Sequence, residues 1–494
     1  MSGWFAGSVS SMNMTSDDLS RPLSLTWRQR LTRPEVLVAL GAFLALCIAV
    51  LTRSMSMLEP DDYAYRASII ALTHGHIILT NTQYLALRHQ LGHTAQPGIM
   101  QWIHLTSGKW ISEKNPGYPF FAAPFQMLGI LRLAPLFYGG LGCIGLYAGA
   151  RRWLGRWGGT WAVVLFCCSG AAIAFAWRAT MPTFTDASLI AAGTGALLWT
   201  MLATEASARR RTVVGLLGFL ALEGATFIRY TNGLVLIVAV IAVLVAWRLA
   251  RLSWRMIACW LASLAAFVAL VAAFGALFYG GVTNTGYAAG EITFSLSAVI
   301  PNLKHMPSHL VSSMPFLVLA AIAAIWIAAR LVLSLRKSLE HSLRSTYRRD
   351  AVVGAALFAS WIAIYGIYLA YTWTVPQASG VGGVGGGGTI HVVRFYVPAL
   401  AAIALLAAWL LSRLPRWLPL AALAVLVGLG GVSYPRLVNG AAGGPGGPGG
   451  AGGFGGPGGQ GQLVGPPANG QQPSGQQPNG SPPSGNQPNG LPGQ

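Results

Sequence analysis

Charged residues are scarce in this chain of 494 residues. They make up 9% of the sequence, and 13 residues in all are acidic. A soluble globular protein carries roughly 25% charged residues. Hydrophobic residues make up 54%, and apolar runs of about 20 residues recur along the chain. This composition excludes a soluble globular protein and predicts an all-α polytopic membrane protein.

The positions of the cysteines do not indicate a disulfide framework either. Each of the five lies inside an apolar segment, where free thiols behave as small hydrophobic groups. We therefore expect no disulfides among Cys47, Cys143, Cys167, Cys168 and Cys259.

A cleavable signal peptide is not predicted at the N-terminus. A polar stretch of 34 residues precedes the first apolar run, and no small-residue cleavage site follows that run. The run is the first of eleven candidate spans, at about 35–52, 133–150, 159–176, 187–204, 213–228, 233–250, 257–279, 313–333, 351–371, 396–412 and 417–433.

Basic residues gather in alternate loops between these spans. The clusters are Arg21 to Arg33, Arg151 to Arg156, Arg209 to Arg211, Arg248 to Arg255, Arg330 to Arg349, and Arg413 with Arg416. The positive-inside rule makes that side cytoplasmic and explains the net charge of +19 without nucleic acid as a partner. We expect a multi-pass protein of the plasma membrane with its N-terminus inside.

The predicted chain has three parts: a cytoplasmic segment 1–34, a transmembrane domain 35–433 and a Gly/Pro/Gln-rich external tail 434–494. The tail has no charge from Leu437 onward and is predicted to be disordered, because it cannot bury enough apolar surface to offset its entropy.

The long external loops are predicted at about 53–132, 280–312 and 372–395. The first is too long for a simple connection, and its interleaved aromatic and apolar residues indicate helices lying on the membrane surface. A glycine run at 382–388 is either a linker or a hinge.

Six acidic residues fall on the predicted external side: Glu59, Asp61, Asp62, Glu113, Asp186 and Glu291. Asp61 and Asp62 directly follow the first span. Two adjacent carboxylates near a membrane surface repel each other and are costly to desolvate. They are either a general base or metal ligand, or the solvated first turn of a helix that begins near Pro60.

Glu113 and Lys114 lie in a second external segment, just before Pro116 and Pro119. These prolines are expected to prevent a regular helix. The acid and the lysine then form either part of a site or a surface ion pair on a turn.

Three further external residues are candidates. Asp186 begins the fourth span, as a site acid or as a helix-start acid near a Thr183 or Thr185 cap. Arg229 and Arg394 lie at span ends, as phosphate ligands or as cations that snorkel to the interface.

Eight of the nine histidines are external, and five share the first loop: His74, His76, His89, His93 and His104. No tight ligand spacing is present, and amphipathic helices carry histidine readily. A divalent metal site therefore stays open, and no other cofactor is indicated.

Taken in order, these segments resemble the GT-C superfamily of membrane glycosyltransferases, near the protein O-mannosyltransferases and the lipid A aminoarabinose transferases. The resemblance covers about residues 35–433. It is carried by Asp61-Asp62-Tyr63, Glu113-Lys114-Asn115-Pro116, Asp186 in MPTFTDASL, Arg229 in FIRYTNGL, Arg394 in VVRFYVPAL and the 280–312 loop. The sequence departs from the family at Asp62 (usually Glu), at Asn115 (an expected Pro) and in the absence of the large soluble C-terminal domain of some members.

The resemblance implies a GT-C fold with about 11 transmembrane helices and juxtamembrane helices in a long first external loop. It also implies a transferase that moves a hexosyl or pentosyl group from a polyprenyl-phosphate donor, with inversion, on the external face of the bilayer. The acceptor is a lipid, a glycan or a protein.

The resemblance assigns catalysis to the acids. Inversion needs one carboxylate to deprotonate the acceptor as it attacks the anomeric carbon. Asp61 is the expected base, with Asp62 or Asp186 positioning the acceptor or sharing the role. Tyr63 supports this motif.

The charge of the leaving lipid phosphate needs cations. Lys114 is the first candidate, followed by Arg394 and Arg229, with Glu113 orienting Lys114 or contacting the sugar.

The alternative from another class is a transporter or flippase. Transporters place charges within spans and often contain internal repeats. Here no clear repeat is found, and Glu223 is the one acid within a span. A polymerase or ligase of surface polysaccharide is a third reading, which differs mainly in its acceptor.

Overall fold

The computed structural model describes residues 32–53, 60–92, 101–287, 293–334, 341–375, 392–415 and 417–442. The predicted disordered tail lies outside these residues except at its start, because helix α19 (Trp417–Ala442) continues past the predicted boundary at 434. Glu59, Glu291 and the glycine run at 382–388 also lie outside the described residues.

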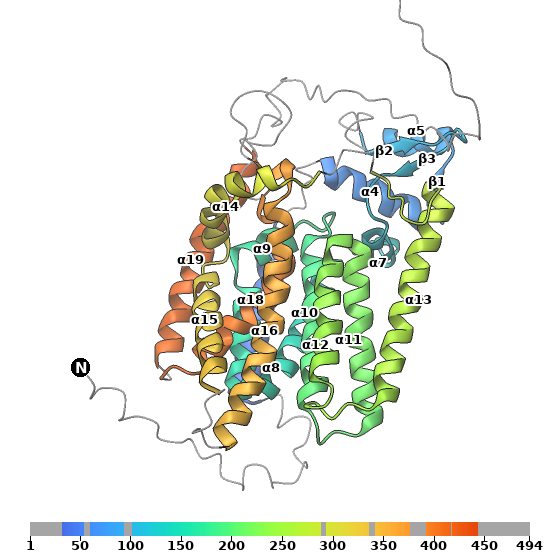
Figure 1. Cartoon of the computed structure of the whole chain (residues 1–494). Helices are drawn as coiled ribbons and strands as arrows, with labels where there is room; N and C mark the ends of the chain where they lie inside the picture. Colours follow the sequence, from blue (N-terminus) through green and yellow to red (C-terminus); the bar gives the residue numbers. More distant parts are fainter. Residues whose placement is uncertain are drawn as a thin grey trace, which may run out of the picture.

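Long helices lying side by side make up most of the described chain (Figure 1). They are α3 (Pro34–Leu51), α8 (Ala134–Cys167), α10 (Thr183–Leu202), α11 (Ala208–Ile228), α12 (Gly233–Ala246), α13 (Trp254–Tyr279), α15 (Leu317–Ser334), α16 (His341–Leu369), α18 (Leu400–Leu411) and α19. Shorter elements join them: α9 (Gly170–Ala176), α14 (Val299–Ser313) and the 3-10 turns η1 (Leu131–Leu133), η2 (Tyr230–Asn232), η3 (Leu296–Ala298), η4 (Thr372–Thr374) and η5 (Val397–Ala399).

The all-α polytopic prediction is confirmed, since each predicted span falls on helix. By length and apolarity alone, five of the described helices are able to cross a membrane, or up to six if the bent pair Leu296–Ser313 and Leu317–Leu333 is one span. The count of about 11 crossings stays a prediction.

Helix α8 is a hairpin of two helices that turn sharply at Gly155, which has φ 81°. A Cβ atom on Gly159 would lie 2.9 Å from the carbonyl oxygen of Tyr147. In a straight helix these residues would be about 18 Å apart. The Sγ atoms of Cys143 and Cys167 also approach to 3.3 Å. The two predicted spans at 133–150 and 159–176 are therefore separate, as expected.

Polar contacts place the described members of the basic clusters at one end of the bundle, called here the basic end. Arg152 pairs with Glu205 at 2.5 Å, joining the turn of α8 to the end of α10. Asp350 accepts hydrogen bonds from Trp153 Nε1 at 2.9 Å and Arg413 Nη2 at 2.9 Å. The opposite end, which carries the candidate acids, is called the site end.

The first long loop folds at the site end into helices and a small sheet. The helices are α4 (Pro60–Thr73), α5 (Asn81–Gln90) and α7 (Gly117–Met127), and Figure 1 shows α4 and α5 beside the strands. The sheet has the order β1-β3-β2, from β1 (Ile78–Leu79), β2 (Trp102–His104) and β3 (Trp110–Ser112), and both pairings are antiparallel. The sequence predicted the helices and missed the sheet, since strands of two or three residues show no alternation.

The expectation that Pro116 and Pro119 prevent a regular helix is wrong. Pro116 is the N-cap of α7 and Pro119 lies in its first turn. The first backbone N–H groups of a helix have no partner within it, so proline costs little there.

Helices α8 and α10 pack most closely along glycines. A Cβ atom on Gly195 would lie 2.1 Å from the backbone carbonyl of Gly145, and one on Gly149 would lie 2.4 Å from the carbonyl oxygen of Gly195. Small residues allow such backbone contact between helices in membranes. Because α10 also carries Asp186, this contact fixes the position of one candidate acid along the axis of the bundle.

We therefore expect Gly195→Ala to lower the thermal unfolding midpoint in detergent, because the added methyl forces α8 and α10 apart and overpacking costs about 1–3 kcal/mol. The matched control is Gly366→Ala, in α16, where no atom lies within 4 Å of the new methyl. That substitution should leave the midpoint unchanged or slightly higher, since alanine favours helix. Equal effects of the two substitutions would contradict the close contact.

Candidate active site

Asp61 is the centre of a cluster of charges at the site end. It lies in the first turn of α4, which begins at Pro60 as the sequence predicted. Its Oδ2 accepts a hydrogen bond from Arg394 Nη1 at 2.7 Å, and its Oδ1 lies 3.3 Å from Lys114 Nζ. Lys114 Nζ is also 3.0 Å from Glu113 Oε1. The structure thus brings four predicted site residues together.

Glu113 and Lys114 do not form a surface pair on a turn. Both residues are buried, and the segment that holds them joins β3 to α7. Burial lowers the pKa of the Lys114 ammonium, but the nearby Asp61, Tyr287 and Glu113 outweigh this and hold its pKa well above the ordinary value. Lys114 therefore stays a cation at neutral pH.

Asp62 points away from solvent into a different pair. Its side chain is fully buried. Its Oδ2 accepts a charge-assisted hydrogen bond from Arg178, and its Oδ1 accepts one from Thr180 Oγ1 at 2.6 Å. The reading of both acids as a solvated helix start is therefore wrong for Asp62. Tyr63 follows on α4 and is half-buried.

Asp186 is fully buried in the first turn of α10. Its Oδ2 lies 3.3 Å from Arg229 Nε and accepts a hydrogen bond from Asn232 Nδ2 at 3.3 Å. Asp186 is a first-turn acid, but the N-cap is Pro182 with no side-chain cap, so the alternative of a Thr183 or Thr185 cap is wrong. The hydroxyl of Thr183 instead accepts a hydrogen bond from Arg229 Nη2 at 3.3 Å.

The two acid sites are linked through the arginines. Arg229 Nη1 donates to the backbone carbonyl of Arg394 at 3.1 Å. Arg394 in turn binds Asp61, so Asp186, Arg229, Arg394 and Asp61 form one chain of contacts. Neither arginine snorkels freely at an interface: the side chains of Arg229 and Arg394 are 14% and 7% exposed.

Aromatic rings hold the guanidinium of Arg394. Its Cζ lies 5.0 Å from the ring centre of Trp373 and 4.7 Å from that of Phe395. Cation–π contacts of this kind contribute about 0.5–2 kcal/mol. They restrict the direction in which the guanidinium points, and Asp61 lies in that direction.

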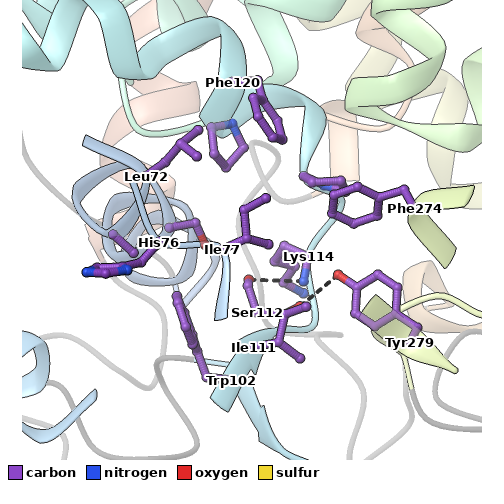
Figure 2. Close-up of a pocket in the computed structure, with 14 residues that line it drawn as sticks. Leu72, His76, Ile77, Trp102, Ile111, Ser112, Lys114, Phe120, Phe274 and Tyr279 are labelled. Carbon is purple, nitrogen blue, oxygen red and sulfur yellow. Dashed lines mark hydrogen bonds between the residues drawn. The ribbon is translucent and has the colours of Figure 1, made fainter. Parts of the chain in front are cut away.

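An apolar pocket adjoins the cluster, with Lys114 in its wall. It lies among α4, β3, α7 and the end of α13. Figure 2 shows the rings of Trp102, Phe120 and Phe274 around it and the Tyr279 hydroxyl donating to the Ser112 carbonyl at 3.0 Å. The pocket therefore has a mostly apolar wall that includes Lys114, the lysine that contacts Asp61.

A metal site is not evident in the described part of the chain, where no group of three or more His, Cys, Asp or Glu side chains is able to hold an ion. Of the five histidines in the first loop, His93 lies outside the described residues.

Sequence reasoning missed the partners rather than the acids. Arg178, Thr180, Asn232, Tyr287 and Trp373 were not candidates. Arg178 is the residue that the sequence signals, because it is one of the few charges on the predicted external face and buried charges need partners.

Comparisons with known proteins identify no family. No protein-family model matches the chain, and no curated protein is detectably similar in sequence.

Solved structures give weak similarities. ArnT from Cupriavidus metallidurans is similar over 81% of this chain and 64% of its own, both in the apo state (17% identity, TM-score 0.46) and bound to undecaprenyl phosphate (16%, 0.45). The Archaeoglobus fulgidus oligosaccharyltransferase is similar over 85% of this chain and 56% of its own, at 11% identity and TM-score 0.47. This chain thus spans less than two thirds of either structure. TM-scores below 0.5 at such identities establish neither fold nor function, so the proposal below rests on the site.

The buried pair of Asp62 and Arg178 gives a test of the site. Arg178→Met should lower the free energy of unfolding by about 3–5 kcal/mol, because it leaves the Asp62 carboxylate buried without its cation. The double variant Asp62→Leu with Arg178→Met should recover part of this loss. Thermal unfolding in detergent measures the double variant and each single variant, Arg178→Met and Asp62→Leu. If the losses of the two single variants simply add in the double variant, the pairing is contradicted.

Proposed function

We propose that the protein is an inverting glycosyltransferase that moves a sugar from a polyprenyl-phosphate donor to an acceptor hydroxyl or amine. The observation that carries this proposal is the position of Asp61, between the cations of Lys114 and Arg394 and beside an apolar pocket. In this proposal Asp61 is the base, its two cations bind the phosphate, and the pocket that Lys114 lines faces the isoprenoid chain.

Asp61 is the base in this proposal because it is the most accessible acid of the cluster. Its side chain is 20% exposed, against 11% for Glu113 and none for Asp62 or Asp186. A general base must come within hydrogen-bond reach of the proton it removes. The fully buried acids instead pair with cations of their own, Asp62 with Arg178 and Asp186 with Arg229.

The cations serve the leaving group. Lys114 and Arg394 stabilise the charge that develops on the phosphate, and the apolar pocket beside Lys114 receives the adjoining part of the isoprenoid chain. Arg229 holds the backbone of Arg394 in place and is the third cation.

The transfer step balances on these groups. The acceptor oxygen or nitrogen forms a bond to the anomeric carbon, while the bond from that carbon to the phosphate oxygen breaks. Its electron pair leaves on the polyprenyl phosphate. The acceptor proton goes to Asp61 Oδ, and attack from the side opposite the leaving group inverts the anomeric centre.

The site is proposed to face the outside of the plasma membrane. The described basic clusters share the opposite end of the bundle, and the positive-inside rule assigns such an end to the cytoplasm. The N-terminus is then cytoplasmic, and the acceptor is an external lipid, glycan or protein.

We expect Asp61→Asn to reduce sugar transfer by at least 10²-fold, since general-base catalysis contributes about 10²–10⁴-fold. The assay follows a radiolabelled polyprenyl-phosphate sugar in membranes, and gel filtration checks folding. A folded variant with full activity would remove Asp61 as base.

Lys114→Met tests the phosphate site in the same assay. It should weaken transfer strongly, because it removes a cation from the leaving group. Lys109→Met is the matched control, since Lys109 is an exposed lysine of the same loop. Comparable losses for both would show a general charge effect in place of a phosphate site.

A further inference from the structure

We propose that Asp61 is also a placeholder anion, which occupies the two cations of the phosphate site and exchanges with the donor phosphate in each cycle. This inference rests on the proposed function and adds a role for the empty site. It predicts an unusual result: neutralising the base should strengthen the binding of a lipid phosphate.

The carboxylate of Asp61 contacts the two cations as a bound anionic ligand would. Its two carboxylate oxygens contact different cations, Oδ1 with Lys114 at 3.3 Å and Oδ2 with Arg394 at 2.7 Å. Two oxygens of a phosphate offer the same pattern of acceptors. Arginine and lysine bind carboxylate and phosphate through the same N–H groups, so these two anions compete for one place.

The charges of the cluster support exchange. Three acids, Asp61, Glu113 and Asp186, stand against three cations, Lys114, Arg229 and Arg394. A phosphate added to this balanced set would leave excess negative charge in a poorly hydrated site, which is costly. Release of one carboxylate from its cations removes that excess.

Asp61 is the anion that is placed to leave. Arg394 is held against the neighbouring rings of Trp373 and Phe395. The turn that carries Trp373 is anchored by Asn302, whose side chain is fully buried and donates to the carbonyl of Tyr371 at 3.0 Å. Asp61 lies at the start of its helix and is the most exposed member of the set, at 20% against 14% for Arg229.

Lys114 is held in the same way. It keeps Glu113 at 3.0 Å and lies 5.0 Å from the ring centre of Tyr287. Glu113 therefore stays with Lys114 when Asp61 departs. Lys114 and Arg394 form the fixed part of the site, and Asp61 and the donor phosphate take turns as the anion that contacts them.

Exchange also couples the proton to the phosphate. When Asp61, already displaced by the donor phosphate, takes the acceptor proton, it becomes neutral and no longer competes for Lys114 and Arg394. At the same moment the C–O bond breaks and the phosphate gains the electron pair and one negative charge. When Asp61 releases its proton to water, it regains the cations and displaces the polyprenyl phosphate.

The test measures binding of undecaprenyl phosphate, and separately of inorganic phosphate, to the full chain in detergent by calorimetry. Asp61→Asn and Asp61→Ala should each bind undecaprenyl phosphate roughly tenfold or more tightly than the unmodified protein, since about 1.4 kcal/mol corresponds to tenfold. Adding Arg394→Met to Asp61→Asn should abolish the gain. Two substitutions of Asp61 guard against a folding defect in one.

Asp62→Asn is the matched control. It removes an equal charge one residue away, but its cation is Arg178, so it should not tighten binding. Affinity that is unchanged or weaker in both Asp61 variants, or tightened equally by Asp62→Asn, would overturn the placeholder role, as would absence of phosphate binding in every variant. Tighter binding in a protein that transfers no sugar would refute the proposed function and leave the placeholder role standing.

Discussion

A carboxylate that is withdrawn from water needs a cation or several hydrogen-bond donors beside it, and this constraint organises the structure. Breaking such a pair costs several kcal/mol, so each pair fixes the elements that supply it. Asp62 joins α4 to the segment between α9 and α10 through Arg178, and Asp350 joins α16 to the end of α18 through Arg413. Asp61 joins the start of α4 to the segment that leads into η5 through Arg394.

The sequence predicted which residues lie together at the site end because acids are rare in it. With 13 acids in 494 residues, each external acid has to be explained, and Asp61, Glu113 and Lys114 do lie in contact. The alternation of basic loops predicted the two ends of the bundle. Long apolar runs predicted the helices, since their length and composition leave few other structures in a membrane.

The pairings were not predictable, because they join residues that are far apart in the sequence. Asp61 and Arg394 are 333 positions apart, and Asp62 and Arg178 are 116 apart. Nothing local says which arginine an acid will meet, so Arg178 was not a candidate and a solvated helix start stood as one of two readings of Asp62. The error at Pro116 has a different origin: proline breaks a helix interior but suits its first turn, and the sequence does not say where α7 begins.

The distribution of charge also favours the proposed enzyme over the alternative of a transporter. A transporter binds its substrate near the middle of the bilayer, at broken helices whose polar groups face one another. Glu223 lies inside a predicted span, in α11, and its partner is the hydroxyl of Ser263, at 2.8 and 3.0 Å from its two oxygens. One carboxyl group with one serine makes a polar link between α11 and α13, but it offers no cation to an anionic substrate. The cations that would bind a phosphate are instead gathered beyond the ends of the long helices, next to the apolar pocket. This position, at the end of the bundle and not within it, is the one that the proposed chemistry on a lipid-linked sugar requires.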